Sequence, residues 1–321
     1  MSRARGLIGA ATAGAVAAGA TRLAYTVLNQ RPPAGTKTWS RTNHRGEPVT
    51  LLEGPAVAVG AIAGALAQAT LGPSRSGTAR SSRAMALAGA GAAAFGGYDD
   101  LAGSGDRRGF RGHLGALRHG EVTTGAIKLG GIGVTGLASA AVAGGSPADV
   151  VINAGLVAGG ANLLNLFDLR PGRAIKVAVA SSALIAAGGS VTGRGAGVAV
   201  PLAAGLGLLR EDLAERAMLG DCGANALGAM LGTAAAGLPR PARIALLAGI
   251  TGLTAASEKV SFTKVIERTP ALRWLDALGR RPPELVPKVM IPAQRGDPAK
   301  FNGAATTLRS AENTDLAPPE E

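Results

Sequence analysis

Acidic side chains stand at the ends of apolar segments in this sequence. Asp99 and Asp100 close one such segment, Asp168 closes another, and Asp221 opens a third. Acidic residues at membrane depth are rare and by default mark function. Carboxylates that converge suit Mg²⁺, a hard cation that binds one or two carboxylates together with substrate phosphates. The four aspartates therefore predict metal-assisted phosphoryl transfer, provided that the fold brings them together.

A phosphate substrate also needs positively charged partners. Lys128 lies at the start of an apolar segment, and Arg170, Arg173 and Lys176 follow Asp168. The alternative interpretation of any single aspartate is an ordinary helix-end charge, because Asp is a common helix cap. For the set of four, we favour function over capping.

The elements that must position these residues are unusually apolar and small. The chain has 321 residues, of which 47% are hydrophobic, 17% charged and 3% aromatic, and it contains 49 glycines. Soluble chains carry about 25% charged residues, whereas small residues let helices pack closely in lipid. We therefore predict an all-α integral membrane protein, a bundle of about nine transmembrane helices. The predicted spans are Gly6–Leu28, Pro55–Leu71, Ala84–Tyr98, Ile127–Ala143, Val150–Phe167, Ile175–Val191, Gly195–Leu209, Cys222–Leu238 and Ala242–Ala256.

The distribution of Lys and Arg predicts the orientation of the bundle. Alternate loops share a side, and most of the 33 Lys and Arg residues fall in one set of loops. The positive-inside rule places this set in the cytoplasm, with the N-terminus outside and the C-terminus inside. The loop 72–83 goes against the rule. The four aspartates then share the cytoplasmic face of a multi-pass protein of the cytoplasmic membrane. The cytoplasmic set comprises 29–54, 99–126, 168–176, 210–221 and the chain after 256.

Composition also bounds the domains and partners. We predict a transmembrane domain over 1–256, a cytoplasmic segment over 257–294 that can lie on the membrane surface, and a disordered tail over 295–321. The net charge of +12 is spread between apolar stretches, which favours anionic lipid headgroups and argues against a nucleic-acid partner. The single cysteine, Cys222, excludes an intrachain disulfide and a multi-cysteine metal site; we interpret it as a packing residue.

The motifs around these aspartates resemble those of the polyprenyl-phosphate N-acetylhexosamine-1-phosphate transferase superfamily. Asp99-Asp100 resembles the family's paired aspartates after the third helix, and Lys128 its downstream lysine. Asn162-x-x-Asn165-Leu-x-Asp168 resembles the motif that ends the fifth helix. Leu219-Gly-Asp221-x-Gly223 resembles the Met-Gly-Asp-x-Gly motif, and His44 to Gly54 resembles the first cytoplasmic loop. The similarity runs from about Arg41 to Ile266.

This resemblance implies an activity and roles for the residues. Family members transfer a sugar-1-phosphate from a UDP-sugar to a polyprenyl phosphate in cell-envelope polymer synthesis, with Mg²⁺ as cofactor and UMP as product. By resemblance, Asp221 is a metal ligand, Asp168 supports the metal or substrate, and Asp99 or Asp100 deprotonates the lipid phosphate with Lys128 assisting. Candidate substrate-binding residues are Asn162, Asn165, Arg170 and Met218. A homodimer is one expected assembly.

Three departures from the family keep a second hypothesis open. Leu169-Arg170-Pro171-Gly172 stands where the family has Gly-Leu-Asp-Gly, so a second aspartate is missing. The region 257–262 lacks the family's histidine cluster, and the tenth helix is absent. The alternative is therefore a relative without catalysis that binds a polyprenyl lipid or a cell-envelope partner. A transporter ranks last, because transporters place ionisable groups near the bilayer midplane and these lie at helix ends.

Overall fold

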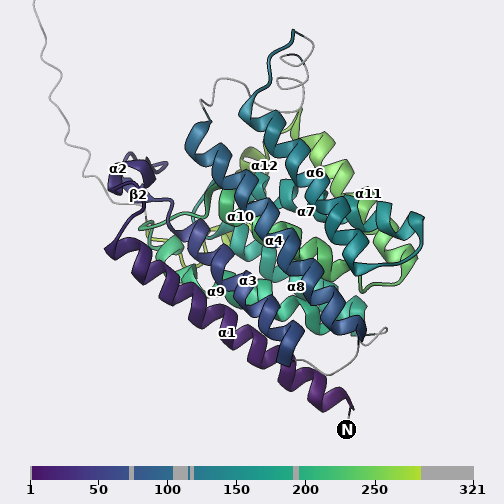
Figure 1. Cartoon of the computed structure of the whole chain (residues 1–321). Helices are drawn as coiled ribbons and strands as arrows, with labels where there is room; N and C mark the ends of the chain where they lie inside the picture. The colour runs from purple at the N-terminus through teal and green to yellow at the C-terminus, as the bar shows by residue number, and fades with distance from the viewer. Residues whose placement is uncertain (1, 72–75, 104–114, 116–118, 191–194, 283–321) are drawn as a thin grey trace, which may run out of the picture. The chain divides into compact units, whose positions relative to one another are not determined.

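The protein is built almost entirely from α-helices. The computed structural model describes residues 2–71, 76–103, 115, 119–190 and 195–282, and Figure 1 labels the elements. The long helices are α1 (Ser2–Gln30), α3 (Glu53–Leu71), α4 (Ser76–Ala102), α6 (Thr124–Ala143), α7 (Pro147–Phe167), α8 (Arg173–Ser190), α9 (Ala199–Leu213), α10 (Gly220–Ala235) and α11 (Arg240–Ser257). The short elements are α2 (Thr36–Trp39), strands β1 (Ser40–Thr42) and β2 (Pro48–Thr50), the 3₁₀ turn η1 (Gly195–Val198), α12 (Phe262–Arg268) and α13 (Pro270–Ala277).

Each predicted apolar span coincides with a helix, with ends shifted by a few residues. Within the described residues, three stretches are long and apolar enough to cross a membrane, namely Gly6–Gln30 of α1, the whole of α6 and the whole of α7. These findings support an all-α protein of membrane type. The number of spans and their orientation stay predictions, and the predicted disordered tail over 295–321 lies outside the described residues.

Alanine is the commonest buried apolar residue, and many large apolar side chains are exposed on the outside. Ala17 and Ala61 are fully buried, while Leu7, Val134 and Leu184 are 66%, 68% and 75% exposed. Exposed leucine and valine on so many helices are unusual for a protein surrounded by water. In lipid the pattern is expected, because large apolar residues can face acyl chains while small residues let the helix backbones approach.

Helix α10 lies at the centre of this packing. It contacts α3, α4 and α7, and every residue of the helix other than Asp221 is buried. At Gly228 the backbones of α10 and α7 are so close that an added Cβ would clash with the carbonyl oxygen of Gly160. Only glycine allows this approach. The contact sets the position of α10 along α7, and with it the position of Asp221.

A short hairpin lies beside the first turn of α10. Strands β1 and β2 pair antiparallel, with Ser40 opposite Thr50. The hairpin turn contains Gly46 at φ +86°, a conformation that glycine adopts at low cost. The Met218 N–H donates to the carbonyl oxygen of Thr50 at 3.0 Å, so the hairpin is attached to the chain that leads into α10. We call this end of the bundle, with Asp99, Asp168 and Asp221, the acidic end.

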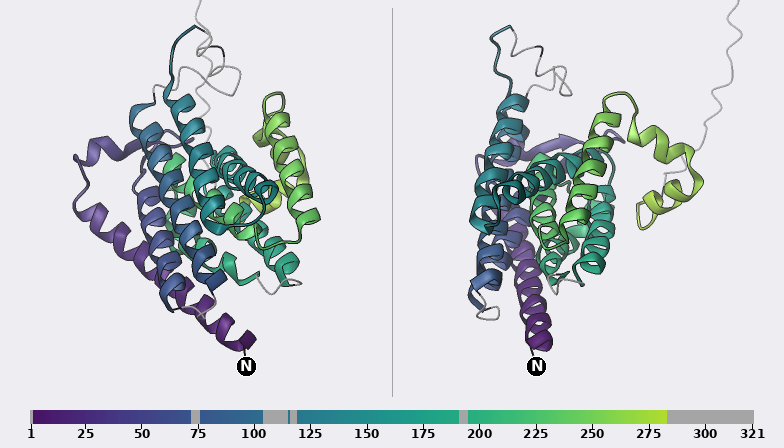
Figure 2. Two further views of the ribbon diagram at one scale, coloured as in Figure 1. Left: turned by 45° about the vertical axis from the view of Figure 1, so that its right-hand side comes forward. Right: turned by 90° about the vertical axis from the view of Figure 1, so that its right-hand side faces the viewer.

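Asp276 is a main anchor of the chain that follows α11. Figure 2 shows α11 and the two short helices that follow it at one side of the bundle. The Arg173 side chain, 4% exposed, donates to both carboxylate oxygens of Asp276 at 2.8 and 3.0 Å. Lys176 Nζ donates to the Asp276 carbonyl oxygen at 2.6 Å, and Arg280 donates to its carboxylate at 2.6 Å. Burial alone would raise the pKa of Asp276, but the hydrogen bonds and charges of these arginines lower it overall.

We expect Asp276→Asn to loosen α12 and α13 from the bundle. Breaking a buried, hydrogen-bonded ion pair costs about 3 kcal/mol, which corresponds to about 100-fold faster amide exchange in these two helices. Hydrogen exchange followed by mass spectrometry measures this directly. The matched control is Glu267→Gln, because Glu267 is 54% exposed and lies 3.7 Å from Arg170, a geometry worth about 1 kcal/mol or less. Equal exchange in the two variants would contradict the anchoring role of Asp276.

Candidate active site

Three of the predicted residues meet at the acidic end. The Lys128 ammonium lies 2.6 Å from an Asp99 carboxylate oxygen and 2.5 Å from an Asp221 carboxylate oxygen. The three side chains come from α6, α4 and α10, and Lys128 and Asp221 are 93 residues apart in sequence. Their side chains are between 15% and 25% exposed. The ammonium thus reduces the repulsion between the two carboxylates, at a position that solvent still reaches.

Asp100 has a different task from its neighbour Asp99. Its two carboxylate oxygens accept hydrogen bonds from the backbone N–H groups of Asp221 at 3.0 Å and Cys222 at 2.8 Å. These are free N–H groups in the first turn of α10, where a negative charge is stabilised. The Asp100 carbonyl oxygen accepts from Arg41 Nη2 at 2.5 Å. Asp100 therefore fixes the start of α10 and leaves Asp99 as the partner of Lys128.

Asp168 lies deeper and belongs to an inner group of carboxyls. It follows the last residue of α7, accepts a hydrogen bond from the Gly220 backbone, and has one carboxylate oxygen that is buried without a partner among the described residues. Glu53 and Asp212 lie close enough to Asp168 to interact electrostatically with it or with each other. Their side chains are 0% and 2% exposed. Burial, followed by the charges of Asp212, Asp221 and Asp100, raises the pKa of Asp168 well above its ordinary value.

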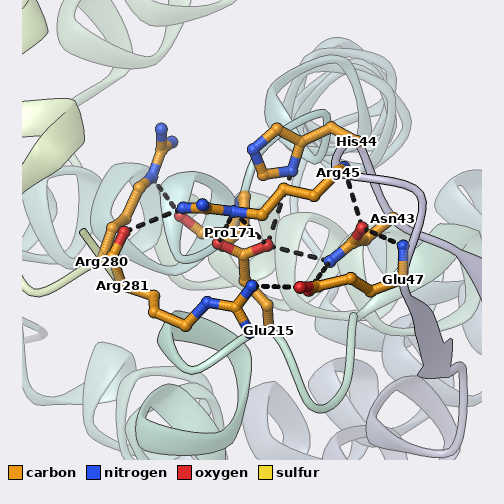
Figure 3. Close-up of polar contacts among 8 residues, drawn as sticks. All are labelled: Asn43, His44, Arg45, Glu47, Pro171, Glu215, Arg280 and Arg281. Carbon is orange, nitrogen blue, oxygen red and sulfur yellow. Dashed lines mark hydrogen bonds and ion pairs between the residues drawn. The ribbon is translucent and has the colours of Figure 1, made fainter. Parts of the chain in front are cut away.

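A polar network joins the hairpin to three other segments (Figure 3). At its centre is Glu215, whose side chain is 1% exposed and whose backbone has φ +58°. Its carboxylate accepts from Arg45 Nε at 2.9 and 3.0 Å and from Asn43 Nδ2 at 2.9 Å. Arg45 also donates to the Arg281 carbonyl oxygen at 2.9 Å, and Arg280 Nε donates to the Pro171 carbonyl oxygen at 2.8 Å. The loop before α8 and the end of the C-terminal segment are thus held against the hairpin.

The predicted substrate-binding residues are distributed around this end. The Asn162 side chain donates to Thr254 Oγ1 of α11 at 3.4 Å, and the Asn165 carbonyl oxygen accepts from the Asp168 N–H at 3.0 Å. Arg170 is 3.7 Å from Glu267, and Met218 is partly exposed beside β2. Asn165 and Met218 thus sit next to Asp168 and Asp221 along the chain, while Asn162 and Arg170 contact the segment from α11 to α12.

Two predicted roles change in the structure. Arg173 and Lys176, expected as phosphate partners, instead bind Asp276 as described above, because the C-terminal segment covers the first turn of α8.

Cys222 is 6% exposed and packs against Ala58 and Ala226, which confirms it as a packing residue. Burial lowers the pKa of His44 against the opposing charge of Glu215, so this histidine is neutral near pH 7. His113 lies outside the described residues.

Sequence reasoning missed Glu53, Asp212 and Glu215. Glu53 lies two residues before the predicted span Pro55–Leu71, and Asp212 lies three residues after the predicted span Gly195–Leu209. The rule that selected the four aspartates therefore also selects these two residues. Glu215 sits in a polar loop of ordinary composition, and no sequence signal marks it. Its importance comes from burial by segments that are distant in the sequence.

Among the described residues, no group of three or more His, Cys, Asp or Glu side chains is arranged to hold a metal ion by itself. Mg²⁺ does not need such a group, since it is commonly held by one or two carboxylates with water and substrate phosphate completing the shell. Asp221 and Asp99 provide hard oxygen donors at a partly exposed position, and the buried Asp168 oxygen without a partner lies nearby.

The raised pKa of Asp168 predicts a pH-dependent stability. The folded state holds the Asp168 proton more tightly than the unfolded state. The free energy of unfolding is therefore highest below the ordinary carboxyl pKa, and it falls as the pH rises from there through the raised pKa of the folded state. Each unit by which the pKa is raised is worth about 1.4 kcal/mol. Between about pH 5 and pH 8, the melting temperature should therefore fall less for Asp168→Asn than for the wild type. Glu258→Gln, an exposed carboxylate, is the control and should follow the wild type; an Asp168→Asn profile parallel to both would refute the assignment.

Known proteins give no independent indication of what this site does. No protein-family model matches the chain, and no curated protein matches it.

Proposed function

We propose that the protein transfers a sugar-1-phosphate from a UDP-sugar to a polyprenyl phosphate, with Mg²⁺, at the cytoplasmic face of the membrane. The single observation that carries the proposal is the meeting of Asp99, Lys128 and Asp221, from three helices, around one point. Carboxylates that were only helix caps would have no reason to converge. Apolar helices on which such a site is built suit a reaction between a lipid and a water-soluble donor.

The reaction assigns separate tasks to the side chains. An oxygen of the polyprenyl phosphate attacks the phosphorus that carries the sugar, a new P–O–P bond forms, and the bond to UMP breaks. Asp99 takes the proton of the attacking phosphate, with Lys128 beside it to hold the phosphate oxygens. Asp100 keeps the first turn of α10 in place, so that Asp221 faces the reacting groups.

Magnesium would be held by Asp221, with Asp168 in support. The metal would supply charge neutralisation on the diphosphate as negative charge moves toward UMP. Lys128 now stands between the two carboxylates. Its flexible four-carbon stem lets the ammonium move toward a phosphate when a divalent cation takes its place.

The test is UMP release by the full chain in detergent with Mg²⁺, undecaprenyl phosphate and a panel of UDP-sugars. We expect release with at least one donor and a loss of 100-fold or more in Asp221→Asn, since removing one electrostatic group of a transition state costs about two to three orders of magnitude. Glu258→Gln, an exposed carboxylate change, is the control and should keep full activity. Release that is unchanged in Asp221→Asn would contradict the role of this residue.

A separate measurement tests the cation site without any substrate. Lys128→Met leaves two carboxylates facing each other, which should destabilise the fold by about 3 kcal/mol without metal. Mg²⁺ should restore stability in this variant more than in the wild type, and should have no effect on Asp221→Asn. At ten times its dissociation constant, Mg²⁺ adds about 1.4 kcal/mol, visible as a shift in melting temperature. An identical Mg²⁺ response in all three proteins would argue against a metal at Asp221.

One observation favours the alternative, a relative without catalysis that binds a polyprenyl lipid or an envelope partner. The C-terminal segment contacts the loop after α7, through Arg280 at Pro171 and Glu267 at Arg170. This is the loop where the family carries its second aspartate. A folded, Mg²⁺-responsive protein that releases no UMP with any donor would favour this alternative.

A further inference from the structure

A second feature of the acidic end is an open cleft outside the aspartate site. Its volume is about 500 Å³, and it lies between the last two turns of α9 and residues 279–281. One wall is apolar, with Leu206, Leu209 and Leu213. The opposite wall and the rim carry Arg280, Arg281 and Arg210. The residues that line the cleft include no acidic side chain, and none of them belongs to the set around Lys128.

The two kinds of wall arise from simple features of the chain. Leu206, Leu209 and Leu213 are three and four residues apart, so they share one face of α9. Arg280 is positioned by Asp276 and by the Pro171 carbonyl oxygen, and Arg281 by Glu47. Positive groups on a fixed backbone therefore face a helical apolar stripe.

Arg210 differs from the other two arginines. It is exposed at the rim of the cleft, and no ion pair of its side chain is found within the described residues. A guanidinium on an apolar stripe is a strong binder of phosphate oxygens, through paired N–H groups and charge. The cleft thus combines a stripe for hydrocarbon with a cationic rim for an anion.

Helix α13, which precedes the cleft residues 279–281, indicates the depth in the membrane at which the cleft lies. Helix α13 leads directly into residues 279–281, and its Leu272, Trp274 and Leu275 are 41%, 64% and 49% exposed. Exposed tryptophan and leucine beside arginine are typical of the boundary between headgroups and acyl chains. Leu206 inside the cleft is itself 44% exposed, as expected of a surface that lipid covers.

We propose that this cleft binds an acidic membrane phospholipid, with its phosphate on Arg210 and Arg280 and an acyl chain along Leu206, Leu209 and Leu213. The site is independent of the proposed transferase reaction. A lipid here would fill the gap between α9 and the C-terminal segment, and so would strengthen the docking of that segment.

The experiment is native mass spectrometry of the full chain released from detergent with phosphatidylglycerol or phosphatidylcholine. We expect retained phosphatidylglycerol and little phosphatidylcholine. Arg210→Gln should lower the retained fraction about fivefold, as expected for one basic residue near an anionic lipid, and Leu206→Ala should lower it as well. The matched control is Arg216→Gln, which removes an arginine that is 58% exposed in the loop after α9 and lies outside the cleft.

Three outcomes would overturn the proposal. Equal retention of the two lipids would show that the charge is not recognised. Equal losses in Arg210→Gln and Arg216→Gln would show general attraction to a basic surface instead of a site. Displacement of phosphatidylglycerol by millimolar inorganic phosphate would show that the cleft takes a soluble phosphate and that the apolar wall contributes nothing.

Discussion

The close contact of α10 with its neighbours is the constraint on which the other features depend. Helix α10 is buried on nearly every side, and the meeting of Gly228 with Gly160 leaves no room for a side chain at that point. The same restriction holds at Gly96 of α4, where a Cβ would clash with the carbonyl group of Asp221. Because the backbones touch, the ends of α4, α7 and α10 have fixed relative positions. The acidic end is a consequence of this packing.

The fixed helix ends place several carboxyl groups close together, and two arrangements reduce the repulsion between them. At the surface of the site, Lys128 lies between Asp99 and Asp221, and Asp100 binds the N–H groups of α10. Deeper inside, no ion pair of Asp168 is found among the described residues, and its raised pKa favours the protonated form. The outer carboxylates can therefore bind a cation and Lys128 can bind a phosphate. The inner carboxyls destabilise the fold least when they are protonated.

Arginines join the loops of the acidic end into one unit. Arg45 connects the hairpin to Glu215 and to the end of the C-terminal segment, and Arg173 binds Asp276 of α13. The guanidinium group suits this work, because it donates several hydrogen bonds in fixed directions. The same network forms one wall of the cleft beside α9. Docking of the C-terminal segment and binding of a lipid there would consequently support each other.

The sequence by itself determined the long helices, with ends that differ by up to eight residues, because apolar runs and small residues act locally through hydropathy and backbone packing. It also singled out Asp99, Asp100, Asp168, Asp221 and Lys128, since an ionisable residue at the end of an apolar run is conspicuous. Only the tertiary structure decided which of them meet. It assigned Asp100 to the start of α10, gave Arg173 and Lys176 to Asp276, and added Glu53, Asp212 and Glu215. Such pairings join residues that are distant along the chain, and they depend on how far α10 and its neighbours can approach, which no local pattern records.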